Sequence, residues 1–324
     1  MALLTNSDTL ITVFGGSGFL GRHVVRALAK RRYRIRVAVR RPELAGFLQP
    51  LGSVGQIHAV QANLRYPRSV ETAVRDAHVV INLVGILFEG RRQRFELVQH
   101  YGAEQVALAS AAYGARLIHV SAIGADEKSA SLYAQSKARG EQAVRAAMPD
   151  ATVIRPSIVF GPEDDFFNRF AAMARVLPAL PLVGGGHTRF QPVFAGDVAE
   201  AIATAIDQRT GQGTVFEFGG PEVRTFRELM EYVLTTTERS RLLMPLPFWL
   251  ARLQASVLQF LPKPPLTPDQ VELLRSDNVV SDKAISEQRT IGAFGVTPSS
   301  IESIVPSYLW RFRKTGQFRT GRFA

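Results

Sequence analysis

The sequence contains no cysteine among its 324 residues. This absence excludes disulfides, iron–sulfur ligation, thiolate zinc sites and thiol catalysis. Any redox chemistry must therefore come from a bound cofactor, and we predict no metal site.

Long apolar runs are also absent. The longest such stretch, around Leu242 to Leu250, is interrupted by Pro245 and Pro247, and it is shorter than the roughly 20 residues that cross a bilayer. Met1 to Asp8 lack the charged start and apolar middle of a signal peptide. We expect a chain that spans no membrane and stays in the cytoplasm.

Acidic residues are few relative to basic ones, with 28 Asp and Glu against 39 Lys and Arg and a net charge of +11. The surplus favours anionic partners, and a well-solvated basic surface is the alternative. No helix-turn-helix, zinc or RNP-type element accompanies the charge. We therefore expect no nucleic-acid partner.

Short β-rich runs alternate with helical patterns through the first half of the chain. The expected strands are Leu10–Phe14, Arg34–Val39, Gln56–Gln61, Val79–Val84, Arg116–Ser121 and Thr152–Arg155, with an alanine-rich helix at Ala103–Ala112. This rhythm predicts an α/β fold with a doubly wound parallel Rossmann-type sheet.

The domain organisation follows from the same pattern. Residues 1–159 form the nucleotide-binding domain, completed by about 196–220, where a helix opened by Asp197 leads to a strand at Thr214–Phe218. Residues 160–195 and 221–324 are expected to form a smaller, discontinuous C-terminal lobe.

Three glycines spaced three apart join the first strand to the first helix. Gly15 permits a tight turn, Gly18 lets a pyrophosphate approach the backbone, and Gly21 lets the helix pack on the strand. The loop predicts a dinucleotide site made by Gly15, Gly16, Ser17, Gly18, Phe19, Leu20, Gly21 and Arg22.

The second strand ends in Arg40 and Arg41, where an NAD-preferring domain usually has an acid. A guanidinium matches a phosphate bidentately, so these arginines, together with Arg22, predict NADP(H) as the cofactor, and solvated arginines are the alternative. Chain order alone places Asn63 and Leu64 beside the adenine and Leu83, Val84 and Gly85 under the ribose.

Tyr133 and Lys137 stand four residues apart, which puts both on one face of a helix. An ammonium next to a phenol favours the phenolate, so Tyr133 is a candidate proton donor or acceptor, with Lys137 also reaching the nicotinamide ribose. Without a Rossmann context, such a pair is usually an exposed helix face.

Together these motifs resemble the extended short-chain dehydrogenase/reductase superfamily. The resemblance rests on the glycine loop, Tyr133 with Lys137, Arg155-Pro156, and the run Gln191 to Ala199. Within that superfamily the chain resembles the atypical branch that contains the NADPH-binding accessory subunit of respiratory complex I and its bacterial relatives. The segments that carry this are Leu83–Leu87, His119–Asp126, Arg155–Asp164 and Asp277–Ser281.

The resemblance implies a function and further site residues. Ser121, Pro156, Ser157 and Ile158 join the expected cofactor ligands. It also implies an accessory subunit docked on complex I, peripheral to the cytoplasmic side of a bacterial inner membrane or to the matrix side in mitochondria, with NADP(H) held as a structural element.

One departure bears on catalysis. Active superfamily members usually have a Ser/Thr cluster just after the fifth strand, whereas here Ser121 is followed by Ala122 and Ile123. Carbonyl reduction lacks its polarising hydroxyl if the active position falls on either of those. The alternatives are a free-standing NADPH-dependent reductase or epimerase using Tyr133 and Lys137, and an NADP(H)-sensing regulator.

The C-terminal part contains two further patterns. The segment Pro245 to Pro262 is almost wholly apolar and fits either a core helix or a helix lying against a partner or a bilayer. The last residues interleave aromatic side chains (Tyr308, Trp310, Phe312, Phe318, Phe323) with basic ones (Arg311, Arg313, Lys314, Arg319, Arg322). This pattern predicts that the C-terminal tail binds an anionic membrane surface.

Overall fold

The computed structural model describes residues 5–90, 93–261 and 264–315. The chain divides into two compact units. The first comprises the described residues up to Pro156 together with Ala195–Phe218 and Ser281–Thr297, and the second comprises Ser157–Phe194, Gly219–Val280 and the described residues from Pro298 onward.

The first unit is built on a seven-stranded parallel sheet with the order β11-β6-β5-β4-β1-β2-β3. Its strands are β1 (Leu10–Phe14), β2 (Arg34–Val39), β3 (Ile57–Gln61), β4 (Val79–Asn82), β5 (Arg116–Val120), β6 (Thr152–Pro156) and β11 (Val215–Phe218). Its helices are α1 (Phe19–Lys30), α2 (Pro67–Val74), α3 (Tyr101–Ala112), α4 (Leu132–Ala147), α6 (Ala195–Asp207) and α10 (Asp282–Ser286). This confirms the doubly wound α/β fold class.

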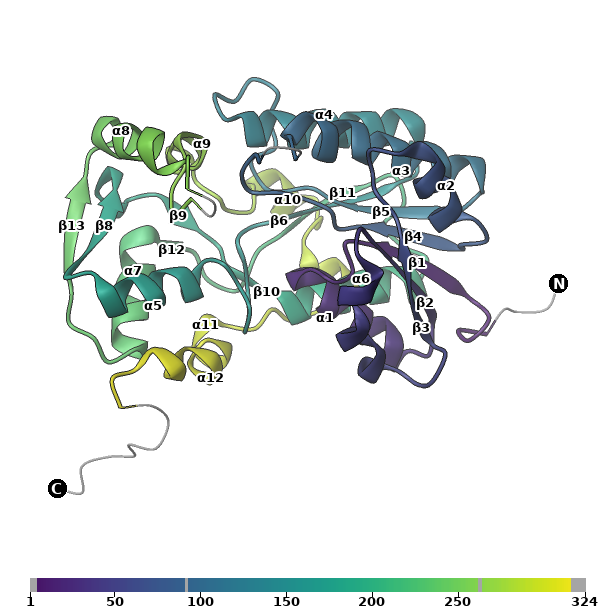
Figure 1. The fold of residues 1–324 in the computed structure, drawn as a ribbon, viewed down its shortest axis with the longest axis horizontal. Helices are drawn as coiled ribbons and strands as arrows, with labels where there is room; N and C mark the ends of the chain where they lie inside the picture. Colours follow the sequence, from purple (N-terminus) through teal and green to yellow (C-terminus); the bar gives the residue numbers. More distant parts are fainter. Residues whose placement is uncertain (1–4, 91–92, 262–263, 316–324) are drawn as a thin grey trace. The chain divides into compact units, whose positions relative to one another are not determined.

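Helices cover both faces of this sheet (Figure 1), as the buried parallel strands require. On one face α1 packs against α6, and on the other α2, α3 and α4 lie over an apolar cluster that includes Phe14, Val80, Val106 and Leu117. The carboxyl ends of β1 to β4 therefore meet at one edge, where a doubly wound sheet binds its ligand.

The expected strands agree with the observed ones to within two residues. The largest difference is at β4, which ends at Asn82 rather than Val84. The Asn82 side chain accepts a hydrogen bond from the Val84 amide at 3.1 Å, so Leu83 and Val84 turn away from the strand.

Residues 281–297 belong to the first unit, which differs from the lobe division expected above. The Glu217 amide donates to the Arg289 carbonyl, and Glu217 Oε2 accepts from the Ser281 amide at 2.8 Å. The Phe216 and Phe294 rings lie 4.7 Å apart. These long-range contacts tie the segment to β11, and no local pattern in the sequence signals them.

The second unit contains two-stranded sheets and helices around an aromatic core. The strands are β7 (Val159–Phe160), β8 (Ala179–Val183), β9 (Arg189–Phe190), β10 (Val193–Phe194), β12 (Arg224–Thr225) and β13 (Leu242–Leu246). The helices are α5 (Phe167–Val176), α7 (Phe226–Thr236), α8 (Phe248–Leu258), α9 (Pro268–Leu273), α11 (Ile301–Ile304) and α12 (Pro306–Leu309). Edge-to-face ring contacts link Phe160, Phe166, Phe167, Phe170 and Phe226 in the core.

The described part of the C-terminal tail is packed into this unit, so several of its aromatic and basic side chains are engaged with the second unit, and the predicted binding of the tail to an anionic membrane stays a prediction. Tyr308 and Phe312 are buried, and the Tyr308 hydroxyl donates to Asp164 at 2.5 Å. Arg311 donates to the Asn168 side chain, and Arg313 donates to the Thr236 carbonyl. Phe318, Arg319, Arg322 and Phe323 lie outside the described residues.

The segment from Pro245 forms the end of β13 and helix α8, and of its residues up to Leu261, only Ala251 and Ala255 are buried. None of the helices within the described ranges is long and apolar enough to cross a membrane.

A buried ion pair joins α4 to β6. Glu141 is 3% exposed and accepts two hydrogen bonds from Arg155, at 2.8 and 2.9 Å. We expect Glu141→Gln to lower the free energy of unfolding by about 2–4 kcal/mol, because it leaves the guanidinium partly unpaired at a desolvated site. Urea unfolding measures this loss.

Glu200→Gln is the matched control. Glu200 pairs with Arg31 on the surface and its side chain is half exposed, so its loss is expected to cost less than about 1 kcal/mol. An equal cost for the two variants would contradict a special role for the buried pair.

Candidate functional site

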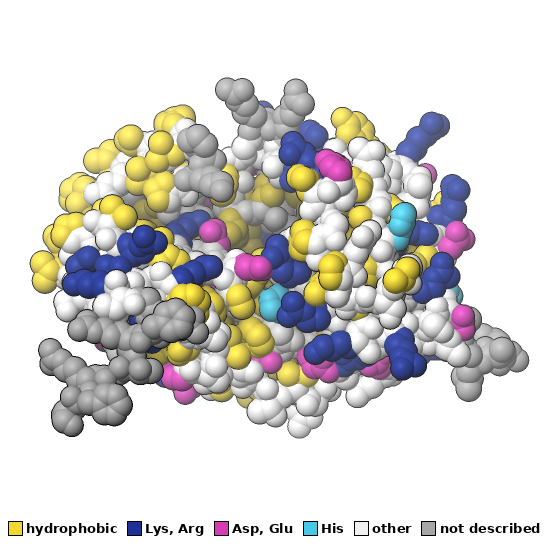
Figure 2. Space-filling view, turned by 60° about the horizontal axis from the view of Figure 1, so that its bottom comes forward, with side chains coloured by type: hydrophobic (Ala, Val, Ile, Leu, Met, Phe, Trp, Pro, Cys, Tyr) yellow, Lys and Arg dark blue, Asp and Glu magenta, His cyan; other side chains and the backbone are white. Residues whose placement is uncertain are grey.

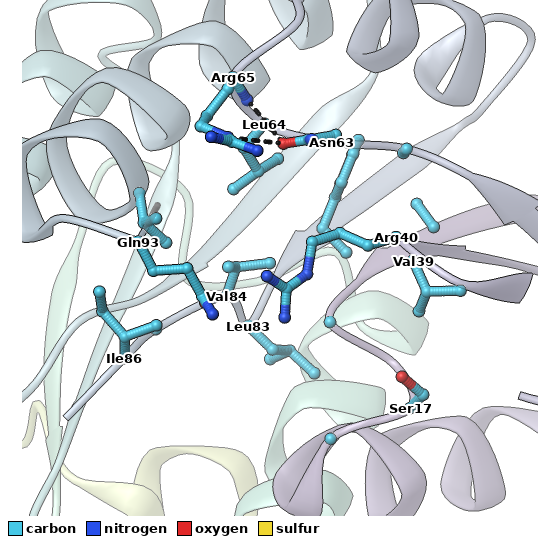
Figure 3. Close-up of a pocket in the computed structure, with 17 residues that line it drawn as sticks. Ser17, Val39, Arg40, Asn63, Leu64, Arg65, Leu83, Val84, Ile86 and Gln93 are labelled. Carbon is cyan, nitrogen blue, oxygen red and sulfur yellow. Dashed lines mark hydrogen bonds between the residues drawn. The ribbon is translucent and has the colours of Figure 1, made fainter. Parts of the chain in front are cut away.

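A cleft of about 270 Å³ opens at the carboxyl edge of the sheet in the first unit. Figure 3 shows the side chains that line it. They come from the ends of four strands and the loops that follow, namely Phe14, Gly15, Ser17, Gly18, Ala38, Val39, Arg40, Ala62, Asn63, Leu64, Arg65, Leu83, Val84, Gly85, Ile86, Gln93 and Val98.

The glycine loop forms the floor of the cleft between β1 and α1. Gly15 has a φ of 79°, a left-handed conformation that side chains disfavour. A Cβ on Gly21 would lie 2.3 Å from the Gly15 carbonyl oxygen and 2.6 Å from the Gly16 Cα. The turn and the close helix packing predicted for Gly15 and Gly21 are therefore present.

The N-terminus of α1 is suited to binding an anion. Gly18 is the N-cap residue and has no side chain that could cap the first backbone amides. No acidic residue lies in the first turn. A helix N-terminus of this kind attracts phosphate through its backbone amides and its dipole. Contact of Gly18 with a pyrophosphate stays a prediction.

The three arginines predicted for a 2′-phosphate occupy different positions. Arg40 follows β2 and its guanidinium points into the cleft (Figure 3). Arg41 is exposed and precedes a 3-10 turn at Pro42–Leu44. The Arg22 guanidinium stacks 4.9 Å from the centre of the Phe47 ring. Arg40 is thus the arginine of the three that lines the cleft.

A further arginine lines the cleft and was missed by sequence reasoning. Arg65 follows β3, and its amide and Nε donate to Asn63 Oδ1 at 3.2 and 3.5 Å (Figure 3). The sequence signal was its place directly after Asn63 and Leu64, both predicted to lie at the site. Arg65 adds a second positive charge to a cleft already lined by Arg40.

The remaining wall comes from the loop after β4. Leu83, Val84 and Gly85 line the cleft as predicted by chain order, and Leu83 donates its amide to the Phe14 carbonyl at 3.0 Å. Ile86, Gln93 and Val98 also line it. These last three were missed, because they lie in a connection that no periodicity assigns.

Tyr133 and Lys137 both lie on α4, as their spacing predicts. Lys137 is 5% exposed, and its Nζ donates to the Val120 carbonyl at 3.2 Å. A Cβ on Gly85 would lie 3.3 Å from that Nζ, so the amine stands beside a cleft-lining residue. The Tyr133 ring packs edge-to-face on Phe95 at 5.9 Å.

Burial lowers the pKa of the Lys137 amine to about 8, and the neighbouring Glu141 carboxylate opposes this shift. The amine is thus held close to the pH at which it loses its charge. A bound anion or polar group beside Gly85 would favour the charged form.

A second buried polar group lies on β5. His119 Nδ1 is 3.2 Å from Asn82 Nδ2, and Asn82 Oδ1 is already engaged by the Val84 amide. The Asn82 amide therefore donates, and the neutral imidazole carries its proton on Nε2. Burial and the Lys137 charge lower the pKa of His119 to about 3. Sequence reasoning missed both residues, because a histidine in an apolar strand has no pattern of its own.

The remaining predicted ligands lie at the ends of β5 and β6. Ser121 is 3% exposed, and its hydroxyl makes no hydrogen bond to a described residue. Pro156 ends β6, and the Ser157 hydroxyl and Ile158 amide donate to Asn278. Asn278 belongs to the Asp277–Ser281 segment noted in the sequence. The cofactor contacts of all four remain predictions.

Comparison with known proteins identifies the class to which this fold and cleft belong. Residues 11–219 match the NAD dependent epimerase/dehydratase family. The chain belongs to this family. A likeness in fold supports the match: the dTDP-glucose 4,6-dehydratase DesIV of Streptomyces venezuelae, solved with NAD and TYD bound, has a TM-score of 0.70 at 18% identity. The likeness covers 93% of this chain and 96% of that one.

Two relatives in sequence are more informative about the particular protein. The NADH dehydrogenase (ubiquinone) 1 alpha subcomplex subunit 9 of Arabidopsis thaliana mitochondria is 35% identical over 96% of this chain and 79% of that protein. A ceramide reductase of Caulobacter vibrioides is 38% identical, over 56% of each chain. The resemblance seen in the sequence is confirmed.

The buried amine gives a prediction about stability. The pKa of the amine falls from 10.5 in the unfolded chain to about 8 in the folded chain. Burying Lys137 therefore costs no stability above pH 10.5, where the amine is neutral in both states. The cost grows as the pH falls and is complete below pH 8, where the folded chain holds the charged amine. At pH 7 the chain folds at a cost of about 3 kcal/mol for burying the charge. We expect Lys137→Met to stabilise the ligand-free chain at pH 7 by about 2–3 kcal/mol, after the lost hydrogen bond is deducted.

Urea unfolding of both proteins at pH 7 and pH 10 checks this. The advantage of the variant is expected to shrink at the higher pH, where the wild-type amine is largely neutral in the folded chain and folding therefore buries little charge. A less stable variant at pH 7 would show that Lys137 is well solvated or paired.

Proposed function

We propose that this chain is an accessory subunit of respiratory complex I that holds NADP(H) as a structural element. The observation that carries the proposal is the similarity, over almost its whole length, to a protein named as a subunit of NADH dehydrogenase (ubiquinone). The glycine loop and cleft supply the dinucleotide site, and the family supplies the nicotinamide cofactor class.

The cofactor preference is supported by Arg40 at the end of β2. Its guanidinium points into the cleft, and Arg65 lines the same cleft from the neighbouring loop. Two cations there complement a 2′-phosphate, which NADP(H) has and NAD(H) lacks. An acid that would bind the ribose hydroxyls of NAD(H) is missing from the end of this strand.

A structural rather than a catalytic cofactor is supported by the chain after β5. Ser121 is followed by Ala122 and Ile123, neither of which can polarise a carbonyl. Tyr133 and Lys137 then serve as ligands of the nicotinamide ribose. If the active position falls on Ala122 or Ile123, the substrate-polarising hydroxyl is missing there, and binding without turnover needs none.

The subunit is peripheral to the membrane that holds its complex, on the cytoplasmic side of a bacterial inner membrane or the matrix side of a mitochondrial one. The basic C-terminal tail is proposed to meet anionic lipid. Because Phe312 and Arg313 are packed into the second unit, the proposal concerns the basic residues that follow, Arg319 and Arg322. The proper test is a truncation after Thr315.

A second function is favoured by the similarity to a ceramide reductase over 56% of the chain. On this alternative the chain reduces a lipid carbonyl with NADPH, Tyr133 donates the proton, and the buried Lys137 lowers the energy of the phenolate. Steady oxidation of NADPH with a defined carbonyl lipid distinguishes this enzyme from the accessory subunit.

The positions of the two arginines give a prediction about cofactor choice. Arg40→Ala is expected to weaken NADPH binding by about 10- to 150-fold, which corresponds to the 1.5–3 kcal/mol of a charge-assisted contact, and to leave NADH binding unchanged. Arg41→Ala, which removes the adjacent arginine that does not line the cleft, is the control and is expected to change NADPH binding less than threefold. Calorimetric titration measures both. An equal loss of NADH and NADPH affinity in Arg40→Ala would refute the 2′-phosphate assignment.

The structural role of the cofactor gives another prediction. Gly18 has a φ of −75°, which valine can adopt, and its Cβ would lie 3.2 Å from the Gly15 carbonyl oxygen, so the loop must give slightly, while the side chain blocks the approach of a pyrophosphate. Gly18→Val is expected to abolish nucleotide retention and to loosen assembly, whereas Tyr133→Phe is expected to leave the level of assembled complex unchanged.

Blue-native electrophoresis and nucleotide analysis of the purified complex read out both variants. A fall of orders of magnitude in a carbonyl-reductase rate on Tyr133→Phe would instead establish catalysis.

A further inference from the structure

Helix α8 of the second unit is apolar on two opposite faces. Phe248, Ala251 and Ala255 form the inner face, which packs with Val183 and Val271. The outer face bears Trp249, Leu253 and Val257, spaced four residues apart and therefore aligned on one side of the helix. Packing into the core of the second unit explains why the inner face is apolar, whereas the outer face contributes nothing to that core.

The outer face is largely exposed. Trp249 is 69% exposed, Leu253 60%, Val257 69% and the following Phe260 84%. Soluble proteins rarely expose such contiguous apolar surface unless it contacts a partner or a membrane. We call Trp249, Leu253, Val257 and Phe260 the α8 face.

The neighbouring strand extends this surface. β13 leads into α8, and its Leu242 and Met244, two residues apart and so on the same side of the strand, are 70% and 55% exposed. Figure 2 shows hydrophobic side chains gathered over the end of the unit that carries β13 and α8, with Lys and Arg side chains beside them.

The charges along and beside this surface are mainly positive, and of the two acids on the adjacent helix α9, Asp269 and Glu272, the latter pairs with Arg275 at 3.1 Å. Between Glu238 and Asp269 the sequence has no acid, whereas it has Arg239, Arg241 and Arg252. Arg239 lies near enough to Arg241 and Arg175 for their charges to lower its pKa, in addition to the larger effect of burial. The segment that forms β13 and α8 therefore has basic but no acidic side chains of its own.

This combination selects one occupant. Apolar and aromatic side chains bordered by cations suit an anionic bilayer, whose headgroups neutralise the arginines while its acyl region takes the apolar side chains. A second copy of this chain, meeting the same surface across a two-fold axis, would bring like-charged arginines together. We propose that the α8 face and β13 form a docking surface for anionic lipid bilayers.

The proposal is independent of nucleotide binding, because every residue that carries it lies in the second unit. It adds a folded surface to the tail proposed above, so the two contributions to membrane binding need separate variants.

Vesicle flotation tests the surface with the full chain. The probe is vesicles of phosphatidylcholine alone or mixed with an equal part of phosphatidylglycerol. We expect binding to the anionic vesicles only, reduced roughly tenfold or more by Trp249→Gln with Leu253→Gln. Arg175→Gln with Arg252→Gln, which removes two exposed cations, is expected to reduce binding to anionic vesicles to a similar extent. Added salt is expected to weaken the binding of the wild-type chain.

Matched controls come from the first unit. Val54→Gln with Leu108→Gln removes exposed apolar side chains, and Arg26→Gln with Arg145→Gln removes exposed cations. Both pairs are expected to bind vesicles like the wild type. Unchanged circular dichroism and urea unfolding of the α8 variants show that they fold, and their unchanged NADPH affinity separates this test from that of the proposed function.

Tryptophan fluorescence locates the contact. The chain has two tryptophans, so Trp310→Phe leaves Trp249 as the sole reporter. Anionic vesicles are expected to shift its emission to the blue and to shield it from a water-soluble quencher.

Three results would overturn the proposal. They are no binding to anionic vesicles, binding that the α8 variants leave intact, and self-association of the wild-type chain that the α8 variants abolish while vesicles have no effect on Trp249.

Discussion

The close contact between α1 and the glycine loop is the constraint on which the site depends. At Gly21 any side chain would meet the Gly15 carbonyl at 2.3 Å, so the helix can approach the loop only with glycine at this position. That approach sets the N-terminus of α1 over the carboxyl edge of the sheet, where the positive end of its dipole faces the cleft. The positions of Arg40 after β2 and Gly85 after β4 then follow from the parallel register of the strands that flank β1.

The polar groups beside this cleft are held at a cost to stability. Lys137 is buried with its pKa lowered to about 8, and His119 is buried as a neutral imidazole with a fixed tautomer. Apolar residues of similar size would make a more stable core there. A buried lysine beside Gly85, which lines the cleft, is understandable if a bound ligand accepts the remaining hydrogen bonds of the amine. This explanation holds whether or not the ligand reacts.

The sequence predicted the parts of the structure that depend on local pattern. Alternating apolar runs located the strands, and the glycine spacing located the loop, because both follow from the geometry of short segments. It did not predict that Arg40 lines the cleft while the adjacent Arg41 does not, since that depends on how the chain leaves β2. It also missed Gln93 and Asn82, whose positions depend on long-range packing. The apolar residues from 245 onward fitted two readings in the sequence, and the exposed α8 face favours the second.

The central claim is that this chain holds NADP(H) within complex I. The most direct measurement is a pull-down of the tagged chain from its native membranes in mild detergent, with identification of the associated proteins and of the nucleotide released on denaturation. The account predicts complex I subunits at fixed stoichiometry and about one NADP(H) for each copy of the chain. Recovery of the chain without complex I subunits, or with NAD(H) in place of NADP(H), would contradict it.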